Sequence, residues 1–338
     1  LIWGQSLGEA IPKHQFYDNQ GIKTEGSFFG KLTQSLSGKL TSFLDLQVRS
    51  INYKVNGQIA GPNSFSVDDN FLFFNPKAGL TYDLEDEQRI YLSYARAQRE
   101  PNRTDYENGS PKPEKLDDFE LGWRINTSKI QAQTNIYWME YKDQLVLTGA
   151  IDAVGSPIRQ NVGKSRRLGI ELELKMNILP KWLWQPNIAI SRNQNLDFYF
   201  KRDGILENLG KTQLAYSPNF VGGSSIMYMP STRFQIGLLS KYVGKQYMGN
   251  IDSENSTLEA YFVNDLNAVF IWKPNKWVSE IQWSFLINNI FNAKYESNGY
   301  FFTYDDDFSV VGQVKTIEGS GYYPQAGINF LTGLKLRF

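Results

Sequence analysis

The chain has 338 residues, no cysteine, one histidine and no net charge. The missing cysteines exclude a disulfide framework and thiolate sites for zinc or iron–sulfur clusters. The balanced charge gives no indication of nucleic-acid binding. Aromatic residues make up 14% of the sequence, which favours one large β structure over two ordinary domains.

The beginning of the sequence carries no export signal. It starts at Leu1, without Met and without a charged and then apolar leader. We therefore expect that a signal segment has been removed or that the sequence is a piece of a longer chain. No apolar run approaches the roughly 18 residues of a membrane-spanning helix.

Several interior segments alternate strictly between apolar and polar residues, namely 119–126, 130–138, 168–176 and 233–238. Within 168–176 the side chains of Leu168, Ile170 and Leu172 share one face, and those of Glu171 and Glu173 share the other. A period of two residues predicts a β-strand with its two faces in different surroundings. Lipid on one side and water on the other is one such arrangement.

The C-terminal residues 330–338 show the same alternation and end on an aromatic side chain. Phe330, Leu334, Leu336 and Phe338 lie on one face. Bacterial outer-membrane barrels usually finish with such a strand, so we interpret Phe338 as a barrel C-terminal signal. The pattern predicts an all-β fold, an antiparallel transmembrane β-barrel, in contact with a lipid bilayer.

The connections between about fourteen predicted strands alternate in length. Short turns are predicted near 37–39, 85–88, 126–129, 179–181, 230–232 and 273–276. Long polar loops are predicted near 9–26, 56–70, 101–114, 149–161, 196–211, 249–257 and 292–323. Short turns on one rim and long loops on the other are typical of outer-membrane barrels. We predict no second domain and no helix.

The search for catalytic and metal sites gives little. His14 is the only imidazole, it lies in a polar segment, and no Gly-x-Ser-x-Gly elbow accompanies it. We expect no enzyme activity and no cofactor. The run Asp305, Asp306 and Asp307 is a weak candidate for calcium, against the alternative of a solvated loop.

The long loops hold the candidate binding residues, because such residues concentrate on loops held by a rigid scaffold. Arg suits planar bidentate capture of anions, and aromatic rings suit a flat or amphipathic ligand. An aromatic girdle at the membrane interface is the alternative for rings near the strands. The predicted ligand-side residues are Arg99, Arg103, Asp105, Tyr106, Tyr247, Tyr300 and Tyr304.

Five stretches resemble the TonB-dependent outer-membrane receptors, in the order of that family. FNPKAGLTYDL (74–84), with IYLSYARAQREPNRTDY (90–106) after it, resembles the family's strand, strand and Arg-x-Pro-Asn-like loop. The family's consecutive barrel hairpins are resembled by LDDFELGWRI (116–125), NIYWMEYKDQLVLTG (135–149) and NVGKSRRLGIELEL (161–174). INNIFNAKYESNGY (287–300) resembles the signature of the penultimate strand, and YYPQAGINFLTGLKLRF (322–338) resembles the closing strand. These sequence stretches are most similar to those in the receptors of Bacteroidetes-type bacteria.

The resemblance implies a twenty-two-stranded barrel filled by an N-terminal plug, which carries the box gripped by TonB. Residues 1–338 then correspond to the C-terminal part of the barrel, and the plug and first strands are absent from the sequence. The implied function is import of a scarce nutrient, such as a ferric siderophore, haem or cobalamin, across the bacterial outer membrane. The implied energy source is the TonB–ExbB–ExbD complex, acting through the plug.

Two other classes stay open at this stage. One is a complete fourteen-stranded pore that passes solutes or lipids without coupling to energy. The other is a surface protein whose loops bind a partner without transport. The sequence does not identify the cargo, because siderophores, haem and cobalamin all use aromatic and charged loops.

Overall fold

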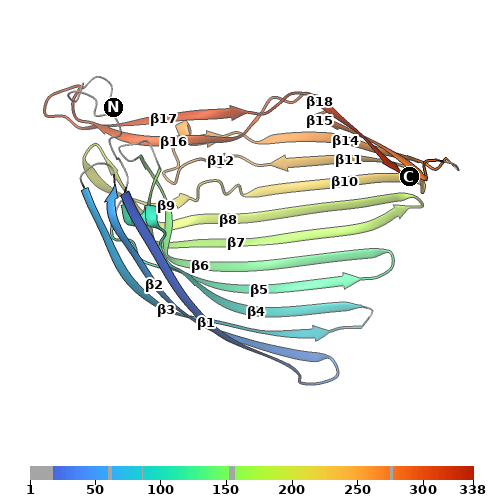
Figure 1. Cartoon of the computed structure of the whole chain (residues 1–338), viewed down its shortest axis with the longest axis horizontal. Coiled ribbons are helices and arrows are strands. Elements are labelled where there is room, and N and C mark those ends of the chain that lie inside the picture. The colour runs from blue at the N-terminus through green and yellow to red at the C-terminus, as the bar shows by residue number, and fades with distance from the viewer. Residues whose placement is uncertain (1–17, 60–62, 86, 108, 152–156, 275–276) are drawn as a thin grey trace.

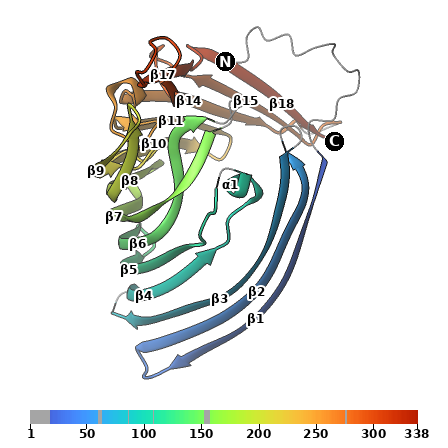
Figure 2. The same ribbon diagram turned by 90° about the vertical axis from the view of Figure 1, so that its left-hand side faces the viewer.

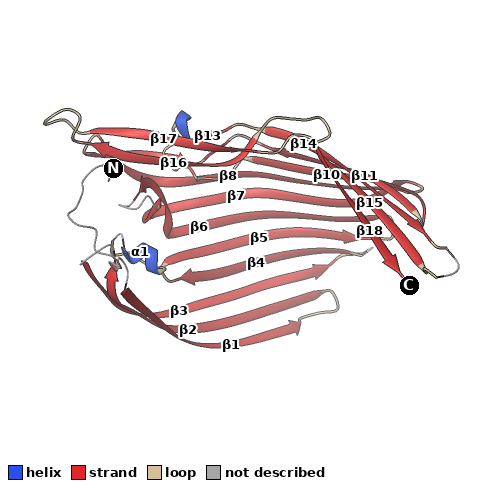
Figure 3. Cartoon of the chain, turned by 45° about the horizontal axis from the view of Figure 1, so that its top comes forward, coloured by secondary structure: helices blue, strands red, loops and turns tan. Residues whose placement is uncertain are grey.

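The computed structural model describes residues 18–59, 63–85, 87–107, 109–151, 157–274 and 277–338. It confirms the predicted antiparallel all-β fold, since a sheet of 16 strands holds most of the described residues (Figure 3). Figure 2, a view along the strands, shows this sheet curved into an open trough with β1 and β18 at its two ends. No helix among the described residues is long and apolar enough to cross a membrane.

Thirteen strands form the main path of the sheet, beside the fourteen or so that the sequence predicts. In order along that path they are β1 (Asp18–Ser35), β2 (Leu40–Ile59), β3 (Asn63–Asp83), β4 (Gln88–Arg99), β5 (Glu114–Asn126), β6 (Ile130–Ile151), β7 (Pro157–Leu179), β8 (Trp182–Arg202), β10 (Phe220–Ser231), β11 (Phe234–Val243), β14 (Tyr261–Trp272), β15 (Glu280–Asn288) and β18 (Asn329–Arg337).

The remaining elements lie at the end of the sheet opposite the short turns. They are β9 (Ile205–Gln213), β12 (Gln246–Tyr247), β13 (Thr257–Leu258), β16 (Glu296–Asp306), β17 (Lys315–Pro324), the helix α1 (Arg103–Glu107) and the 3-10 turn η1 (Glu254–Ser256). The prediction of no helix was therefore wrong, because α1 and η1 are short helical turns. Both are too short to show the periodicity from which a helix is recognised in a sequence.

All six predicted short turns separate consecutive strands, and Figure 1 shows them together at one rim. The predicted long loops need correction. Segments 56–70, 149–161, 196–211 and 292–323 are largely strand, and β1 begins already at Asp18. Strands continue past the apolar zone because pairing with a neighbour still satisfies the backbone hydrogen-bonding groups. The part of the 9–26 prediction before residue 18, with His14, lies outside the described residues.

The two faces of the sheet differ as the alternation predicts. On β8 the outward Ile188 is 37% exposed and stands opposite Leu172 of β7. Its neighbour Asn187 lies on the concave face opposite Glu173. On β18 the outward Phe330 and Leu334 are 77% and 65% exposed, which suits side chains that meet lipid.

The polarity of the two faces reverses within β2 and β3. From Leu44 to Val48 the outward side chains of β2 are apolar, and Gln47 lies on the concave face. Farther along, Ile51 and Val55 on the concave face are 1% and 0% exposed, while Asn52 faces outward. The pairing of β2 with β3 continues through this point without a shift in register. The reversal therefore marks where the strands leave the membrane and enter water.

Beyond that level the wall has a hydrophobic core of its own. Phe198 is 1% exposed and packs with apolar residues of four further segments, namely Val146, Val162, Leu214 and Ile251. The β6–β7 hairpin bends away from the wall (Figure 2), and Ala150 of β6 pairs with Thr303 of β16. This core gives the extracellular hairpins a fixed base.

Candidate functional site

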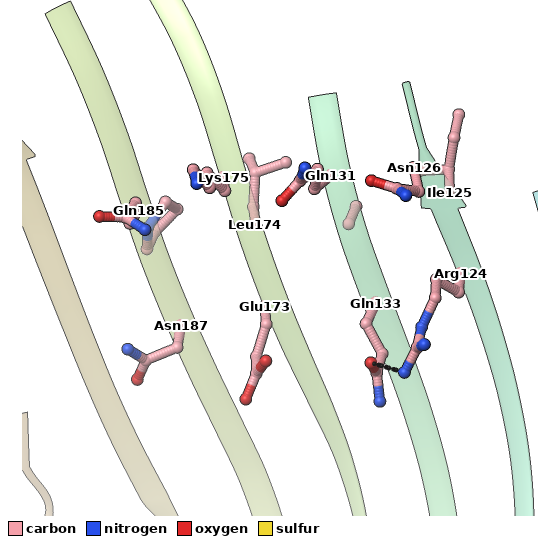
Figure 4. A pocket seen from close by; sticks show the side chains of 12 residues that line it. Arg124, Ile125, Asn126, Gln131, Gln133, Glu173, Leu174, Lys175, Gln185 and Asn187 are labelled. Atoms are coloured by element: carbon pink, nitrogen blue, oxygen red, sulfur yellow. Dashed lines mark hydrogen bonds between the residues drawn. The ribbon is translucent and has the colours of Figure 1, made fainter. Parts of the chain in front are cut away.

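The concave face of the trough is lined by uncharged polar groups and by charges of both signs. A shallow pocket of about 490 Å³ lies on β5 to β8 near the rim of short turns (Figure 4). Its polar side chains include Arg124, Gln133, Glu173, Lys175 and Asn187, and Arg124 donates to Gln133 over 2.7 Å. Such a lining suits a water-filled lumen and selects no particular ligand.

The helix α1 lies on the concave side of the sheet (Figure 2) and fastens two parts of the wall. Asp105 is 4% exposed, and its carboxylate lies 2.9 Å from the guanidinium of Arg159 on β7. Its other oxygen accepts the backbone N–H of Asn102 over 2.8 Å. Because this acid is buried and already paired with protein groups, its position suits an anchor better than a ligand contact.

Tyr106 fastens α1 to the other part of the wall. Its hydroxyl donates to a carboxylate oxygen of Asp69 on β3 over 2.6 Å, and its ring stacks on Tyr53 of β2 at 5.8 Å. Burial raises the pKa of Tyr106 far above its usual value, and the hydrogen bond to Asp69 raises it further. The phenol therefore stays neutral and keeps its hydrogen bond at every physiological pH.

The two predicted arginines at this loop also have protein partners, although both remain partly accessible. Arg99 lies 2.9 Å from Glu114 and its side chain is 60% exposed. Arg103 lies 2.9 Å from Glu107 and donates to Asn19 of β1. Beside them Glu100 pairs with Lys23 and with Arg49 of β2, at 3.7 Å from the latter. Their role as ligand contacts stays a prediction.

The predicted tyrosines of the last long loop lie together on one face of the β16–β17 hairpin. Tyr300, Phe302 and Tyr304 form a row of stacked rings with centroids 6.3 and 6.4 Å apart. Tyr323 of β17 lies against Tyr300 at 6.0 Å. We call these four residues the aromatic row. Tyr300 is 49% and Tyr323 is 51% exposed, so the row is open to a ligand.

Two glycines explain why the rings lie flat. Gly321 stands opposite Tyr300, and Gly319 stands opposite Phe302. A Cβ atom on either glycine would meet the facing ring at 2.4 Å. The missing side chains let each ring cover the neighbouring backbone, as aromatic residues do opposite glycine in sheets. The alternation of Gly319, Ser320 and Gly321 is the signal in the sequence for this arrangement. Phe302 is an aromatic residue of the same predicted loop but is not among the predicted ligand-side residues.

The opposite face of the same hairpin holds it in place. Glu318 accepts from Ser253 and Asn255 next to η1, and lies 3.3 Å from Arg202 of β8. Thr316 and Asp203 exchange two hydrogen bonds of 2.7 Å. The aromatic row is thus presented on a hairpin that is tied to the extracellular core.

Tyr247 lies apart from the aromatic row, on β12. Its ring is 5.8 Å from the ammonium of Lys245, and its backbone carbonyl accepts from Tyr216. The seven predicted residues thus lie in three places. Arg99, Arg103, Asp105 and Tyr106 lie at or beside α1, Tyr300 and Tyr304 lie in the aromatic row, and Tyr247 lies on β12. Arg159 was not predicted, because its partner Asp105 is far away in the sequence and no motif links the two.

The three aspartates proposed for calcium do not converge. Asp305 lies 3.4 Å from Lys201 and accepts from Thr316, whereas Asp306 accepts backbone N–H groups of its own turn at Phe308 and Ser309. Asp307 is exposed. Across the described ranges, no group of three or more acidic, histidine or cysteine side chains is placed to hold a metal ion.

Lipid-facing strands and a polar concave face are the features of an outer-membrane β-barrel. The sequence profile of the family described as "TonB dependent receptor-like, beta-barrel" matches residues 4–292. The chain therefore belongs to the TonB-dependent receptor family, and its location is the bacterial outer membrane. The resemblance seen in the sequence is confirmed at the level of the family.

Two curated relatives are receptors. The pesticin receptor of Yersinia enterocolitica is 26% identical over 227 residues, which cover 65% of this chain and 31% of the relative. The catecholate siderophore receptor Fiu of Escherichia coli K12 is 23% identical over 241 residues, or 65% of this chain and 29% of that protein. The chain thus spans about a third of the length of these relatives.

A solved structure gives the same fold. The siderophore receptor PiuA of Acinetobacter baumannii superimposes with a TM-score of 0.69 at 17% identity, over 94% of this chain and 44% of PiuA. At this identity the likeness concerns the fold alone. The alternatives of an uncoupled pore and of a surface binding protein find no support in these relatives, which are named as receptors.

Proposed function

We propose that the native protein containing this chain captures a ferric siderophore at its extracellular end and imports it with energy from TonB. The curated relative named as a catecholate siderophore receptor supports this cargo class. The aromatic row is the observation in this chain that carries the proposal. Its exposed rings offer flat faces to the aromatic or amphipathic groups of a chelator.

Ligand contact, structural support and energy coupling are assigned to different parts of the protein. The aromatic row and the accessible Arg99 and Arg103 contact the ligand, while Asp105 and Tyr106 hold α1 across the wall. A plug domain that precedes the barrel, with TonB, ExbB and ExbD acting on it, supplies the coupling. We propose no catalytic role for any residue.

Binding of a ferric catecholate to the purified native protein tests the role of the row. The variant Y300A/F302A/Y304A should bind at least about tenfold more weakly, because each lost stacking contact contributes roughly 0.5–1.5 kcal/mol. The matched control is Phe308→Ala in the same hairpin, since Phe308 is 65% exposed and lies outside the row. Unchanged binding by the triple variant, or an equal loss in the control, would overturn this assignment.

The energy source is tested separately. In cells that lack TonB, iron uptake through the protein should stop while ligand binding at the cell surface persists. Uptake that continues without TonB would contradict active import, whatever the binding result.

A further inference from the structure

The outward face of strands β4 to β7 carries three successive rows of side chains near the extracellular end. The first row is aromatic and apolar, and its members stand opposite one another across the four strands: Tyr94, Phe119, Trp138 and Leu168. The second row, two residues farther along each strand, is Arg96, Asp117, Glu140 and Arg166. The third row is Gln98, Lys115, Lys142 and Lys164.

The third row places three like charges directly opposite one another. Lys115 pairs in register with Lys142, and Lys142 pairs with Lys164. All three side chains are exposed. Adjacent strands are about 4.8 Å apart, so the three residues span roughly 10 Å. Like charges in this arrangement repel one another and destabilise the sheet unless an anion lies between them.

The acids of the second row are already neutralised by partners of their own. Asp117 receives two hydrogen bonds from Arg96, of 2.8 and 3.1 Å, and a third from Tyr94 of 2.6 Å. Lys115 adds a Coulombic attraction to Asp117.

Glu140 is engaged in the same way. It accepts from Arg166 and, over 2.7 Å, from Trp138, and Arg166 also lies over the Trp138 ring at 5.3 Å. Within the part of the chain that the structure describes, no ion pair or hydrogen bond involves the ammonium groups of the three lysines.

The lysines stand at the outer edge of the headgroup layer of the membrane. Aromatic side chains such as Tyr94 and Trp138 mark the edge of the hydrocarbon. Each row lies two residues, or roughly 6.6 Å, farther along strands that tilt by about 45°. The second row therefore stands about 5 Å beyond the first row, and the lysine row stands about 9 Å beyond it. A headgroup layer is roughly 5–8 Å thick. The second row therefore lies within it and the lysine backbone just beyond it, from where the long side chains reach back to the phosphates.

We propose that Lys115, Lys142 and Lys164 form a binding surface for the phosphate groups of an anionic lipid in the outer leaflet. The lysines bind the phosphates, the neutralised second row supports them without repelling the anion, and the first row contacts the acyl chains below. The site lies on the outer wall and is separate from the aromatic row that the proposed function uses for nutrient capture.

Native mass spectrometry of the purified full-length protein tests the proposal. The protein is titrated with a phosphate-bearing anionic lipid, phosphatidylglycerol, and with zwitterionic phosphatidylcholine of the same chain length. The wild type should retain the anionic lipid preferentially, and K115Q/K142Q/K164Q should bind it roughly a hundredfold more weakly, since each basic residue near a charged surface contributes about 1 kcal/mol and about 1.4 kcal/mol is a factor of ten. The charge-conserving K115R/K142R/K164R should bind as the wild type does.

The matched control removes three lysines from the concave face, where no lipid reaches them. Lys31 and Lys77 both flank Asp45, and Lys241 stands opposite Gly223. The variant K31Q/K77Q/K241Q should keep the lipid preference. Full retention of the preference by K115Q/K142Q/K164Q, or an equal loss in this control, would overturn the proposal. Displacement of the lipid by inorganic phosphate at equal concentration would also overturn it and indicate a site for free anions. None of these outcomes depends on siderophore binding.

Discussion

The lower and upper parts of the wall are built from the same strands but with opposite hydrophobic faces. In β2 the side chains of Leu44, Leu46 and Val48 point outward, whereas those of Ile51 and Val55 point inward. In the lower part the outward apolar face contacts lipid, and the concave face, which contacts water, is polar. The upper part stands in water and buries its apolar face against other hairpins. The upper part is therefore organised as a water-exposed head on a membrane wall.

The largest expected effect is in the extracellular core. Phe198→Ala should lower the free energy of unfolding by about 3–5 kcal/mol, because it removes a fully buried ring and leaves a cavity. The matched change Phe262→Ala removes a ring that is 53% exposed on the outward face of β14 and should cost less. Denaturant unfolding of the protein refolded into micelles measures both. Equal costs would contradict a separate core in the head.

In the membrane part, the cost of introducing an arginine should depend on which face of the sheet carries it. Ile188→Arg places a charge on the outward face and should destabilise the protein by about 2–4 kcal/mol near the bilayer midplane. Asn187→Arg, one position away, faces the lumen opposite Glu173 and should change stability by less than about 1 kcal/mol. The same unfolding assay in lipid vesicles separates the two. A tolerated Ile188→Arg would mean that this face does not meet lipid.

The attachment of α1 should have an intermediate effect. Tyr106→Phe leaves the buried side chain in place but removes its hydrogen bond to Asp69, which should cost about 1.5–3 kcal/mol because the acceptor is charged. Tyr53→Phe, in the stacking partner, is the control. Hydrogen exchange of residues 103–107 should increase only in the Tyr106 variant. Unchanged exchange there would show that α1 is held by other contacts.

The smallest expected effect is the acid sensitivity of the β16–β17 hairpin. Burial alone would raise the pKa of Glu318, but hydrogen bonds from Ser253 and Asn255 and the charge of Arg202 outweigh it and hold this pKa below its usual value. A depressed carboxylate pKa contributes stability above the unfolded value, near pH 4.5, and this contribution is lost as the pH falls through the folded value.

Protection of the hairpin from hydrogen exchange should therefore decrease below about pH 4.5 in the wild type. In Glu318→Gln the protection should be weaker at neutral pH and nearly independent of pH in this range, with a difference of less than about 1 kcal/mol. A wild-type hairpin whose protection stays constant down to pH 3 would contradict the role of Glu318.

The sequence predicted the lower wall well because lipid enforces strict alternation there. Segments such as 168–176 and all six short turns could be recognised directly. The upper wall was mistaken for loops because its strands are polar on the outside and irregular in pattern. In 196–211, for example, the apolar Phe198 and Phe200 stand among charged residues, and β8 pairs with β9 through two shifts in register.

The candidate site was predicted in part for a similar reason. Tyr300 and Tyr304 could be identified because they belong to an aromatic-rich segment that was predicted to be a long loop. The partners of α1 could not, because Asp69 and Arg159 reach it only after three separate hairpins have formed. Tertiary structure decides which charged loop residues form such internal pairs, and this choice leaves no local pattern in the sequence.

A scan of β2 with single cysteines tests the central claim, the reversal of the two faces, most directly. The chain has no cysteine of its own, so each introduced thiol at residues 44–56 can be labelled individually in the reconstituted protein. We predict that thiols at 44, 46 and 48 report a lipid environment, those at 52 and 54 react with water-soluble reagents, and those at 51 and 55 are protected. Lipid-exposed thiols at every second position through 56, without a reversal near 50, would contradict the account.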